Sequence, residues 1–409
     1  MRTIEEHRKT IAELVAGALA TRRVVVRRVS EGVSGEVLAD DVVAPLDLPP
    51  FANSQMDGYA VVASDLEGGA ARLAVGRRIP AGHVPAPLTP GTAAPIMTGA
   101  ALPDGADAVV QIERADPPRF QDEGGASTVS LPGPVPVGQF VRAVGSDVRR
   151  GDTLLRAGTV LRGPHYGILA SSGVESVRVL DAPVVLLVST GSELAAEPGP
   201  LGGAAIHDAN GASLRVALEE ADARVIVRRV ADDGDALLRL ARLGVEADSA
   251  DLVVTTGGVS EGAYEVVRET FAPRGVEFGS VAMQPGGPQG WGVLDLGGRS
   301  VPVVAFPGNP VSALISFEMF LREPLQRAAG RPVQDRDRVA ILSEGADSPP
   351  GKHQIRRGRL DPAGRVVFVG GPGSHLLHSY ALATHLVHLP VGISRVEAGD
   401  EVVVWPLDD

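Results

Sequence analysis

Three turns built from small and polar residues each follow a short apolar run in the second half of the chain. They are Ser189-Thr190-Gly191-Ser192-Glu193, Thr255-Thr256-Gly257-Gly258-Val259-Ser260 and Pro307-Gly308-Asn309-Pro310. Small residues leave backbone N–H groups accessible, and such groups bind anions where a strand passes into a helix. The turns therefore predict a site for a phosphate or another oxyanion.

The apolar runs before these turns predict the elements that position the site. The runs are Val184–Val188, Leu252–Val254 and Val301–Phe306, and a helix-like stretch follows each turn. Continuous apolar runs of this kind are typical of buried parallel strands. In an open α/β sheet, ligands bind in the crevice beyond the carboxyl ends of the strands. We therefore expect a parallel α/β unit with its ligand site at the three turns.

Composition excludes several classes of protein. The 409 residues, 44% of them hydrophobic, suffice for about two to four domains with ordinary cores. A formal net charge of −12 argues against a nucleic-acid or anionic-membrane partner. Without cysteine, the chain offers no disulfide, thiolate metal ligand or thiol nucleophile. No apolar run approaches the roughly 18 residues of a transmembrane helix, and the N-terminus lacks a signal core, so we expect a cytoplasmic protein.

Changes of residue pattern along the chain predict four domains. A Thr3/Glu6 capping box begins an amphipathic helix that extends to about residue 20. Neither this helix nor the later segment that ends near Val179 has enough apolar residues for a core of its own, so we expect the two to combine. The predicted domains are residues 1–47 with 141–179 (discontinuous, N-terminal), 48–140 (β-rich), 180–330 (α/β) and 331–409 (small, C-terminal, β).

Five motifs occur in one order along the chain. They are Ser54–Val61, Thr98–Asp107, Ser189–Leu194, Thr256–Ser260 and Pro307–Val311. Taken singly, pieces such as Asp57-Gly58 are common turn signals. Together the five motifs resemble the molybdopterin molybdenumtransferase family, which includes the E domain of gephyrin. The resemblance extends over nearly the whole chain.

The resemblance implies a fold and an activity. Members of this family are elongated homodimers of four-domain chains, and their central three-layer α/β domain resembles molybdopterin adenylyltransferase. They take adenylylated molybdopterin and molybdate, cleave the adenylate, and release molybdenum cofactor with AMP. We therefore expect a multidomain α/β plus β protein that uses Mg²⁺ for the hydrolysis. Other proteins of molybdenum cofactor biosynthesis are expected partners.

Site residues follow from the same resemblance. Glu193 and Glu265 would hold the metal ion. Asp57 and Thr98 have no partner evident in the sequence, so they are expected to act in the site of the partner subunit. The implied catalytic residues are Asp57, Thr98, Glu193, Asp232 and Glu265, and the implied ligand-binding residues are Thr190, Gly257, Gly258, Ser260, Gly308, Asn309, Pro310, Arg356 and Ser374.

Several of these residues have a structural alternative. A carboxylate such as Glu193 is favoured near any helix N-terminus, and Asp232 has acidic neighbours that are typical of a solvated helix start. Asn210 is predicted to be the N-cap of a helix that starts near Ala212. The C-terminal basic cluster is equally well interpreted as a solvated face. Its members are Lys352, Arg356, Arg357 and Arg359.

The chain departs from the family pattern at ligand-facing motifs. It has Gln284-Pro285-Gly286-Gly287-Pro288 where the family carries Lys-Pro-Gly-Lys-Pro, and Glu265 stands where Asp is expected. Each lost lysine removes a charge-assisted contact of about 1.5–3 kcal/mol.

Three functions therefore stay open at this stage. The first is a working transferase in which Arg268 or the C-terminal arginines replace the lysines, and this hypothesis is favoured. The second is a divergent paralogue that binds molybdopterin or a partner protein with little or no catalysis. The third, molybdopterin adenylyltransferase, is disfavoured because such enzymes lack the first 180 residues. The sequence leaves molybdate and tungstate undistinguished.

Overall fold

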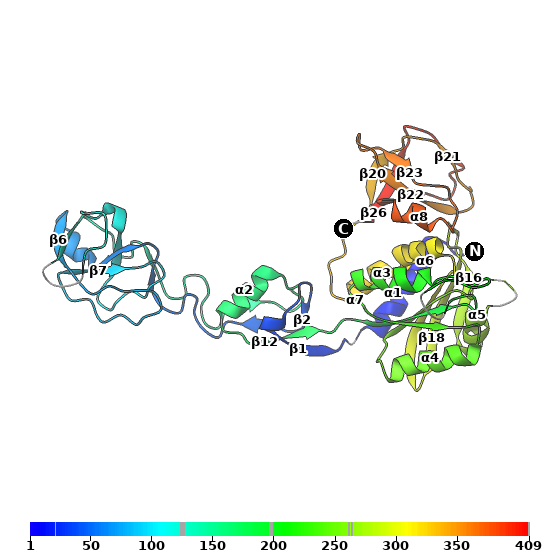
Figure 1. Ribbon diagram of the computed structural model, residues 1–409, viewed down its shortest axis with the longest axis horizontal. Coiled ribbons are helices and arrows are strands. Elements are labelled where there is room, and N and C mark those ends of the chain that lie inside the picture. Colours follow the sequence, from blue (N-terminus) through cyan, green and yellow to red (C-terminus); the bar gives the residue numbers. More distant parts are fainter. Residues whose placement is uncertain (21, 123–126, 196–198, 261, 263–264, 408–409) are drawn as a thin grey trace. The chain divides into compact units, whose positions relative to one another are not determined.

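The structure is a computed structural model that describes the whole chain except residues 21, 123–126, 196–198, 261, 263–264 and 408–409. The chain forms two compact units (Figure 1). Unit 1 comprises Met1–Val24 and Leu180–Asp409, and unit 2 comprises Val25–Val179. Each hydrophobic cluster among the described residues belongs to one unit.

A six-stranded mixed sheet forms the centre of unit 1. Its strands lie in the order β14 (Arg224–Val230), β13 (Val184–Thr190), β15 (Leu252–Thr256), β19 (Arg299–Phe306), β18 (Pro288–Leu296) and β16 (Val276–Ser280). The first four strands are parallel, and β18 and β16 are antiparallel to their neighbours. The three predicted strands are thus confirmed. Every residue of β13 and β15 is buried, as expected for strands covered on both faces.

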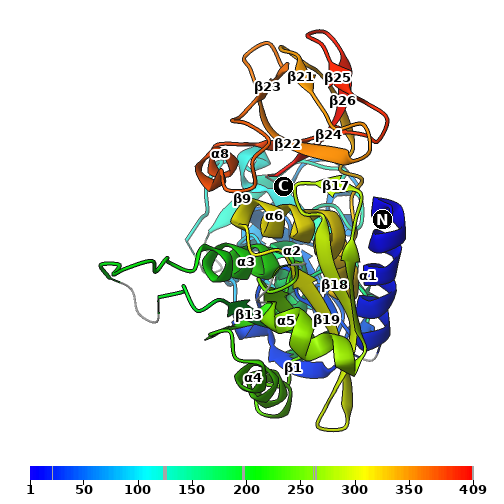
Figure 2. The same cartoon turned by 90° about the vertical axis from the view of Figure 1, so that its right-hand side faces the viewer.

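Helices cover both faces of this sheet. Alternate residues of each strand contribute to two separate clusters, one of which contains Leu187 while the other contains its neighbour Leu186. One face packs against α1 (Ile4–Ala18), α3 (Ala209–Glu220) and α6 (Pro310–Ser316), and the other against α4 (Gly234–Glu246) and α5 (Val266–Phe271). Figure 2 shows α3 and α6 on one side of the strands and α4 on the other. In the part of the chain that is described, no helix is long and apolar enough to cross a membrane.

Helix α1 lies elsewhere than the sequence suggested. The capping box is present, because Thr3 Oγ1 accepts from the Glu6 N–H at 3.1 Å and Glu6 accepts from the Thr3 N–H at 3.0 Å. The apolar stripe of the helix, however, packs into the core of unit 1 rather than against residues 141–179. The physical reason is that the helix covers β18, β19 and the turn of π-helix η5 (Phe317–Leu321), which would otherwise expose apolar surface. The four domain boundaries themselves stay predictions.

The C-terminal part of unit 1 contains a second sheet. One strand of this sheet, β17 (Met283–Gln284), comes from the α/β part of the chain. The strand order is β17, β22 (His353–Leu360), β24 (His385–Leu389), β26 (Glu401–Pro406) and β20 (Arg338–Ile341). The short helix α8 (Leu377–Ala381) and the strands β21 (Ala346–Asp347), β23 (Val366–Phe368) and β25 (Arg395–Val396) complete this part, and β23 pairs with β22. The short helix α7 (Arg322–Ala328) follows η5 and packs against α1 in the α/β part. Because β17 runs parallel to β22, the segment from Gln284 to Pro288 is fixed beside the start of β22.

Unit 2 is rich in short strands. Its largest sheet has the order β8 (Ala108–Gln111), β5 (Gly58–Val61), β7 (Thr92–Ile96), β6 (Ala71–Val75) and β9 (Thr128–Leu131). Helix α2 (Gly163–Ser171) packs with a sheet of β1 (Val24–Arg28), β12 (Ser176–Leu180) and β2 (Val37–Leu38). The paired strands β3 (Val42–Val43) with β11 (Thr153–Leu155) and β4 (Asn53–Ser54) with β10 (Val141–Arg142) are shorter. The β-rich character predicted for residues 48–140 is present in this unit.

Candidate functional site

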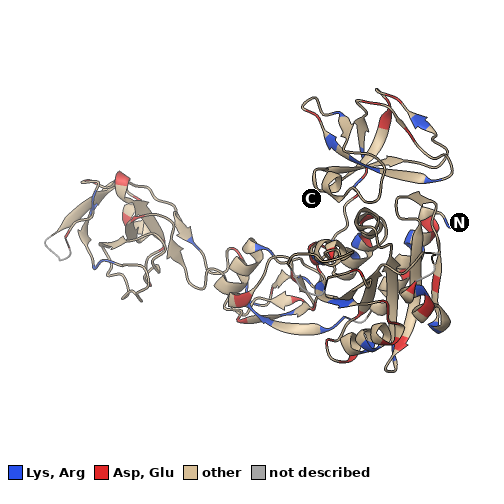
Figure 3. Ribbon diagram, turned by 45° about the vertical axis from the view of Figure 1, so that its right-hand side comes forward, with Lys and Arg blue, Asp and Glu red and all other residues tan. Residues whose placement is uncertain are grey.

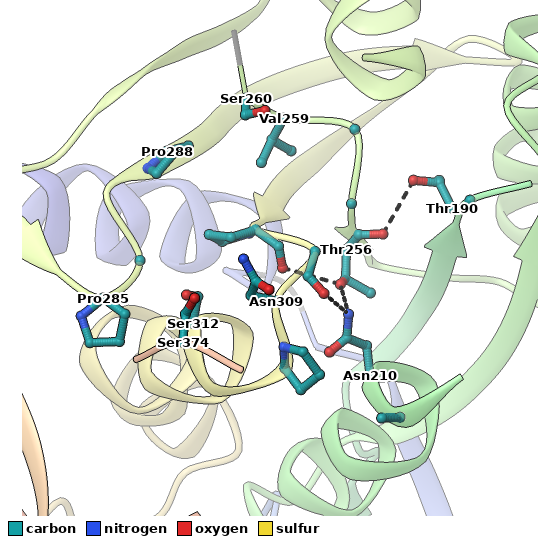
Figure 4. Close-up of a pocket in the computed structure, with 18 of the residues that line it drawn as sticks. Thr190, Asn210, Thr256, Val259, Ser260, Pro285, Pro288, Asn309, Ser312 and Ser374 are labelled. Atoms are coloured by element: carbon teal, nitrogen blue, oxygen red, sulfur yellow. Dashed lines mark hydrogen bonds between the residues drawn. The ribbon is translucent and has the colours of Figure 1, made fainter. Parts of the chain in front are cut away.

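The three predicted turns meet at one crevice in unit 1. Because β13, β15 and β19 are parallel, their carboxyl ends lie at one edge of the sheet, and all three turns line a cavity of about 1140 Å³. We call the residues 189–193, 256–260 and 307–310 the strand-end wall. Opposite elements of the lining are Gln284–Pro288, Lys352 and Pro372–Ser374, which we call the β17–β22 wall. Figure 4 shows side chains of both walls around the cavity.

Thr256 and Asn210 join the turns of the strand-end wall. Asn210 Nδ2 donates to Thr256 Oγ1 and to the carbonyl oxygen of Gly308, both at 2.7 Å. Thr190 Oγ1 donates to the Thr256 carbonyl oxygen at 3.3 Å. Figure 4 shows these bonds as dashed lines from β13, β15 and α3. One amide thus fixes the second turn against the third.

The prediction that Asn210 is an N-cap is wrong. Helix α3 starts at Ala209, and its N-cap is Asp208, whose Oδ1 accepts from the Gly211 N–H at 2.7 Å. Two residues with N-cap propensity stand two positions apart, and the first of them takes the role. Asn210 is therefore inside the first turn of the helix and turns its amide to the crevice. Sequence reasoning missed this site residue because its partners are distant in the chain.

Gly257 lets two of the turns approach closely. Its φ of +93° lies in the left-handed region, and a Cβ there would lie 2.7 Å from the Thr190 carbonyl oxygen. A Cβ on Gly308 would in turn lie 3.4 Å from Gly257 Cα. The strand-end wall is therefore a backbone surface whose shape depends on glycine.

Two predicted carboxylates, Glu193 and Asp232, line the crevice near the first turn. Asp232 Oδ2 accepts from the Ser192 N–H at 3.0 Å, and the Asp232 N–H donates to Ser192 Oγ at 3.1 Å. Its neighbour Asp233 is the N-cap of α4, so Asp232 is not required for the helix start. Glu193 is exposed to the crevice, and no described residue donates a hydrogen bond to its carboxylate.

Glu265 is bound by its own turn. Its Oε2 accepts from the Ser260 N–H at 2.9 Å, and its Oε1 accepts from the Gly262 N–H at 3.2 Å and from Ser260 Oγ. Residues 261, 263 and 264, between these two positions, are outside the described part of the chain. Glu265 and Ser260 both line the crevice, and they form hydrogen bonds with each other. Their roles toward a ligand stay predictions.

Pro310 and Asn309 occupy the positions that the sequence indicated. Asn309 is the N-cap residue of α6 and Pro310 is its first residue, where the missing N–H of proline removes no helical bond. Gly308, Asn309 and Pro310 all line the crevice.

The arginines that were expected to replace the family lysines are not part of the described lining of the crevice. Arg268 lines a neighbouring pocket with Glu269 and Pro273, and its Nη1 donates to the Ser260 carbonyl oxygen at 3.2 Å. Arg356 is buried, its guanidinium lies 4.5 Å from the centre of the Phe368 ring, and its Nη2 donates to the Gly370 carbonyl oxygen at 3.3 Å. Burial lowers the pKa of this guanidinium.

Arg357 is buried more fully than Arg356 and binds the next carbonyl group. Its Nη2 donates to the Gly371 carbonyl oxygen. Burial, followed by the charge of Arg356, lowers the pKa of Arg357. Both arginines thus hold the loop that presents Ser374 to the crevice, rather than lining the crevice themselves.

Two further predicted site residues belong to unit 2. Asp57 Oδ1 accepts from the Thr98 N–H at 2.6 Å and from Thr98 Oγ1 at 2.8 Å. The backbone bond first and the hydroxyl bond second lower the pKa of the Asp57 carboxyl. Both residues are exposed. In the sequence neither residue had an evident partner in its own chain, whereas the structure joins them to each other, and their role in the site of the partner subunit stays a prediction.

Family models match the chain in three consecutive segments. The MoeA N-terminal region (domain I and II) matches residues 2–173. A probable molybdopterin binding domain matches residues 186–327, and the MoeA C-terminal region (domain IV) matches residues 339–407. The middle segment contains the three turns of the strand-end wall.

Similar proteins match over their full length. Molybdopterin molybdenumtransferase 2 of Mycobacterium tuberculosis, from two strains, is 42% identical over an alignment of 421 residues that covers 100% of both chains. Molybdopterin molybdenumtransferase of Haemophilus influenzae is 30% identical, with 92% of each chain covered. The crystal structure of the molybdopterin biosynthesis MoeA protein from Pyrococcus horikosii is 29% identical, covers 100% of this chain and 99% of that chain, and has a TM-score of 0.80. These matches confirm the predicted multidomain α/β plus β fold.

Proposed function

The chain belongs to the molybdopterin molybdenumtransferase family of molybdenum cofactor biosynthesis, and we propose that its crevice binds adenylylated molybdopterin and molybdate and releases AMP. The observation that supports this most directly is the meeting of three anion-binding turns and two carboxylates, Glu193 and Asp232, at one cavity. Its volume of about 1140 Å³ slightly exceeds that of ordinary ligand pockets, which reach roughly 1,000 Å³, as a nucleotide joined to a pterin requires.

The strand-end wall is suited to the phosphates of this substrate. Gly257, Gly258 and Gly308 leave the backbone accessible at the ends of three parallel strands, where N–H groups bind phosphate oxygens. Thr190, Ser260 and Asn309 add polar side chains along the same surface. The wall would therefore hold the pyrophosphate while the nucleotide and the pterin extend to either side.

Glu193 and Glu265 are suited to a Mg²⁺ ion. Mg²⁺ binds one or two protein carboxylates together with substrate phosphates and waters. Among the described residues, no group of three or more His, Asp or Glu side chains could hold a metal ion alone, so the nucleotide would supply the remaining oxygen ligands. The bound ion would supply the positive charge that favours attack of water on the pyrophosphate. Glu193 is the more accessible carboxylate, because Glu265 already accepts three hydrogen bonds.

Asp57 and Thr98 support a homodimer. Their exposed, mutually bonded pair lies in unit 2, whereas the crevice lies in unit 1. We therefore propose that the pair completes the crevice of the partner subunit. The test mixes an Asp57→Asn chain with a Glu193→Gln chain. If sites form across a twofold interface, random exchange restores about a quarter of the native activity, whereas sites formed within one chain would stay inactive in the mixture.

Release of AMP from adenylylated molybdopterin, with molybdate and Mg²⁺, tests the activity itself. Glu193→Gln keeps the size of the side chain and removes its charge, so AMP release should fall by about 100-fold or more if a metal ligand is lost. Glu277→Gln is the matched control, because Glu277 is exposed on β16 and does not line the crevice. Equal rates in the two variants would remove Glu193 from the mechanism.

One observation keeps a second function in view. Gln284 and Gly287 line the crevice at positions where lysines were expected, and the loss of these cations favours binding without turnover as the second candidate function. Tight binding of adenylylated molybdopterin with no AMP release, and release in a Gln284→Lys, Gly287→Lys variant, would establish that function.

A further inference from the structure

The crevice has a strongly uneven distribution of charge. Acidic and basic residues are interspersed along the chain as a whole (Figure 3). The described lining of the crevice, in contrast, has four carboxylates and a single Lys or Arg side chain, that of Lys352. The carboxylates are Glu193, Asp208, Asp232 and Glu265. An oxyanion that enters this crevice is repelled by those charges unless a cation offsets them.

Lys352 is fixed beside the turn of the β17–β22 wall by strand pairing. His353 N–H donates to the Ala282 carbonyl oxygen at 2.9 Å, and Met283 is paired with His353 in the parallel ladder. The next pair is joined by its side chains, because Gln354 Nε2 donates to Gln284 Oε1 at 2.9 Å. The backbone of Lys352 therefore has a defined place next to the segment that leads to Gly286.

Lys352 lines the crevice, and its ammonium group is available to a ligand there. The residue is half-buried, and no ion pair or side-chain hydrogen bond joins it to any described residue, although its backbone N–H donates to the Pro349 carbonyl oxygen at 3.1 Å. The other cations near this wall are engaged elsewhere. Arg356 and Arg357 bind the carbonyl groups of Gly370 and Gly371, and Arg268 lies in the adjoining pocket.

Lysine is rare in this chain, which makes its presence here informative. Of the 38 Lys and Arg residues, two are lysines, Lys9 and Lys352. Lys9 lies on α1 with its side chain 79% exposed and 3.9 Å from Glu13. A compact ammonium on a flexible stem reaches a tetrahedral anion without the planar fork that suits arginine to carboxylates. The chain therefore offers an internal comparison between one surface lysine and one crevice lysine.

We propose that Lys352 anchors a tetrahedral oxyanion in the crevice, on the wall that Ser374 also lines, and so supplies the cation that positions 284 and 287 lack. This assignment rests on the proposed function. Two sources present the same chemistry, molybdate itself and a phosphate group of the pterin ligand. Of the groups on the β17–β22 wall, Lys352 alone brings a full positive charge, so the energy of anion binding should depend mainly on this residue.

Calorimetric titration of the full-length protein with molybdate, and separately with inorganic phosphate, tests the assignment. Lys352→Met should weaken binding of the anchored anion by about 10- to 100-fold, as expected for loss of one charge-assisted contact. Lys352→Arg should retain most of the affinity, and Lys9→Met should retain all of it. Loss for molybdate identifies molybdate as the occupant, and loss for phosphate alone identifies the phosphate of the pterin ligand. Unchanged affinity for both anions in Lys352→Met overturns the proposal.

Chemical modification provides a readout that does not depend on affinity constants. Reductive methylation followed by mass spectrometry reports the two lysines separately. The anchored anion should slow methylation of Lys352 severalfold and leave Lys9 unaffected. Equal rates at Lys352 with and without either anion would contradict the assignment.

A second substitution distinguishes the loss of an anion contact from a loss of folding in Lys352→Met. Gln284→Lys added to Lys352→Met places an ammonium on the neighbouring strand of the same wall, and it should recover at least part of the lost affinity. Failure to recover any affinity would show that the position of Lys352, or its role in the fold, was misassigned, and thermal unfolding of both variants distinguishes these two outcomes.

The proposed function can fail independently. If the native chain releases no AMP but loses anion affinity in Lys352→Met, the anion site stands without the transferase. If the native chain releases AMP and Lys352→Met keeps both affinity and rate, the transferase stands and the anchor is wrong.

Discussion

The two walls of the crevice are held in place by different kinds of interaction. The strand-end wall is made of turns at the ends of adjacent parallel strands, and a Cβ added to Gly257 would lie 2.7 Å from the Thr190 carbonyl oxygen. The β17–β22 wall is assembled from three segments that are distant in the chain, and its chemistry depends on one side chain, that of Lys352. The first wall should tolerate no change of backbone shape, and the second should respond mainly to changes of charge.

A glycine substitution should break the strand-end wall and have the largest effect. Gly257→Ala places a Cβ 2.7 Å from the Thr190 carbonyl oxygen at a φ of +93°, so the free energy of unfolding should fall by about 1–3 kcal/mol. AMP release should fall by at least a factor of ten as the turn is displaced. Denaturant unfolding and rate measurements check both effects. Gly202→Ala is the control, because its Cβ would meet no atom within 4 Å, and equal behaviour of the two variants would refute the backbone account.

The sequence predicted the strand-end wall because local rules suffice for it. Apolar runs indicated β13, β15 and β19, and Pro310 marked the first residue of α6 by its fixed φ and missing donor. Asn210 was wrongly predicted to be the N-cap. Its side-chain amide donates to the strand-end turns, and Asp208 accepts the hydrogen bond at the start of the helix instead. That donor role is visible only after β15 and β19 have been placed.

The β17–β22 wall was not predictable in the same way. Lys352 appeared in the sequence as one member of a basic cluster, and nothing local distinguishes it from Arg356. Its position follows from the pairing of Met283 with His353, two residues that share no sequence pattern. Helix α1 gives the same lesson, since its amphipathic stripe predicted a helix with one buried face but not that this face packs in unit 1.

Acidification should loosen the β17–β22 wall before the strand-end wall. His388 is 4% exposed in β24, and a distance of 3.1 Å joins its Nδ1 to Nε2 of His353, the residue after Lys352. Burial first, and then the charges of His353, Arg8 and Arg336, lower the pKa of His388 from 6.5 to about 3. Above pH 6.5 the imidazole is neutral in both the folded and the unfolded state and has no effect on stability. Below pH 6.5, His388 takes up a proton in the unfolded state but stays neutral in the folded state.

The loss of stability should therefore grow as the pH falls from 6.5 towards 3, by about 1.4 kcal/mol per pH unit and about 2 kcal/mol at pH 5. Thermal unfolding across this range should give a slope of stability against pH that is smaller in His388→Gln than in the native protein. The difference should correspond to the uptake of at most one proton on unfolding. His378→Gln, which changes an exposed histidine of α8, should leave the slope unchanged. Hydrogen exchange at pH 5 should show earlier opening of β22 and β24 than of β13 and β15. Parallel slopes in the native and His388→Gln proteins would show that this histidine does not couple the wall to pH.

Loss of the Asn210 amide should loosen the strand-end wall without distorting it. Asn210→Ala removes the donor that serves both Thr256 Oγ1 and the Gly308 carbonyl oxygen, so unfolding should become easier by about 1–2 kcal/mol. KM for the adenylylated substrate should rise more than kcat falls, because the third turn is released while the carboxylates stay in place. Ser213→Ala, on the same helix, removes a hydroxyl that bonds the α3 backbone and should change neither constant. A fall in kcat alone would instead place Asn210 at the reacting atoms.

The smallest effect is expected for substitution of Arg356. This substitution tests whether Lys352 alone provides the positive charge that binds the anion at the β17–β22 wall. If Arg356 touched the ligand, as the sequence suggested, Arg356→Met would weaken anion binding as much as Lys352→Met. The side chain instead lies over Phe368 and donates to the Gly370 carbonyl oxygen, away from the crevice. Burial lowers the pKa of Arg356, and the charge of Glu344 offsets this only in part. Removal of such a buried guanidinium is close to neutral for stability, because the desolvation it required is also removed. The dissociation constant for the anchored anion should therefore change by less than about threefold, and calorimetry of the two variants side by side would show whether one cation or two serve this wall.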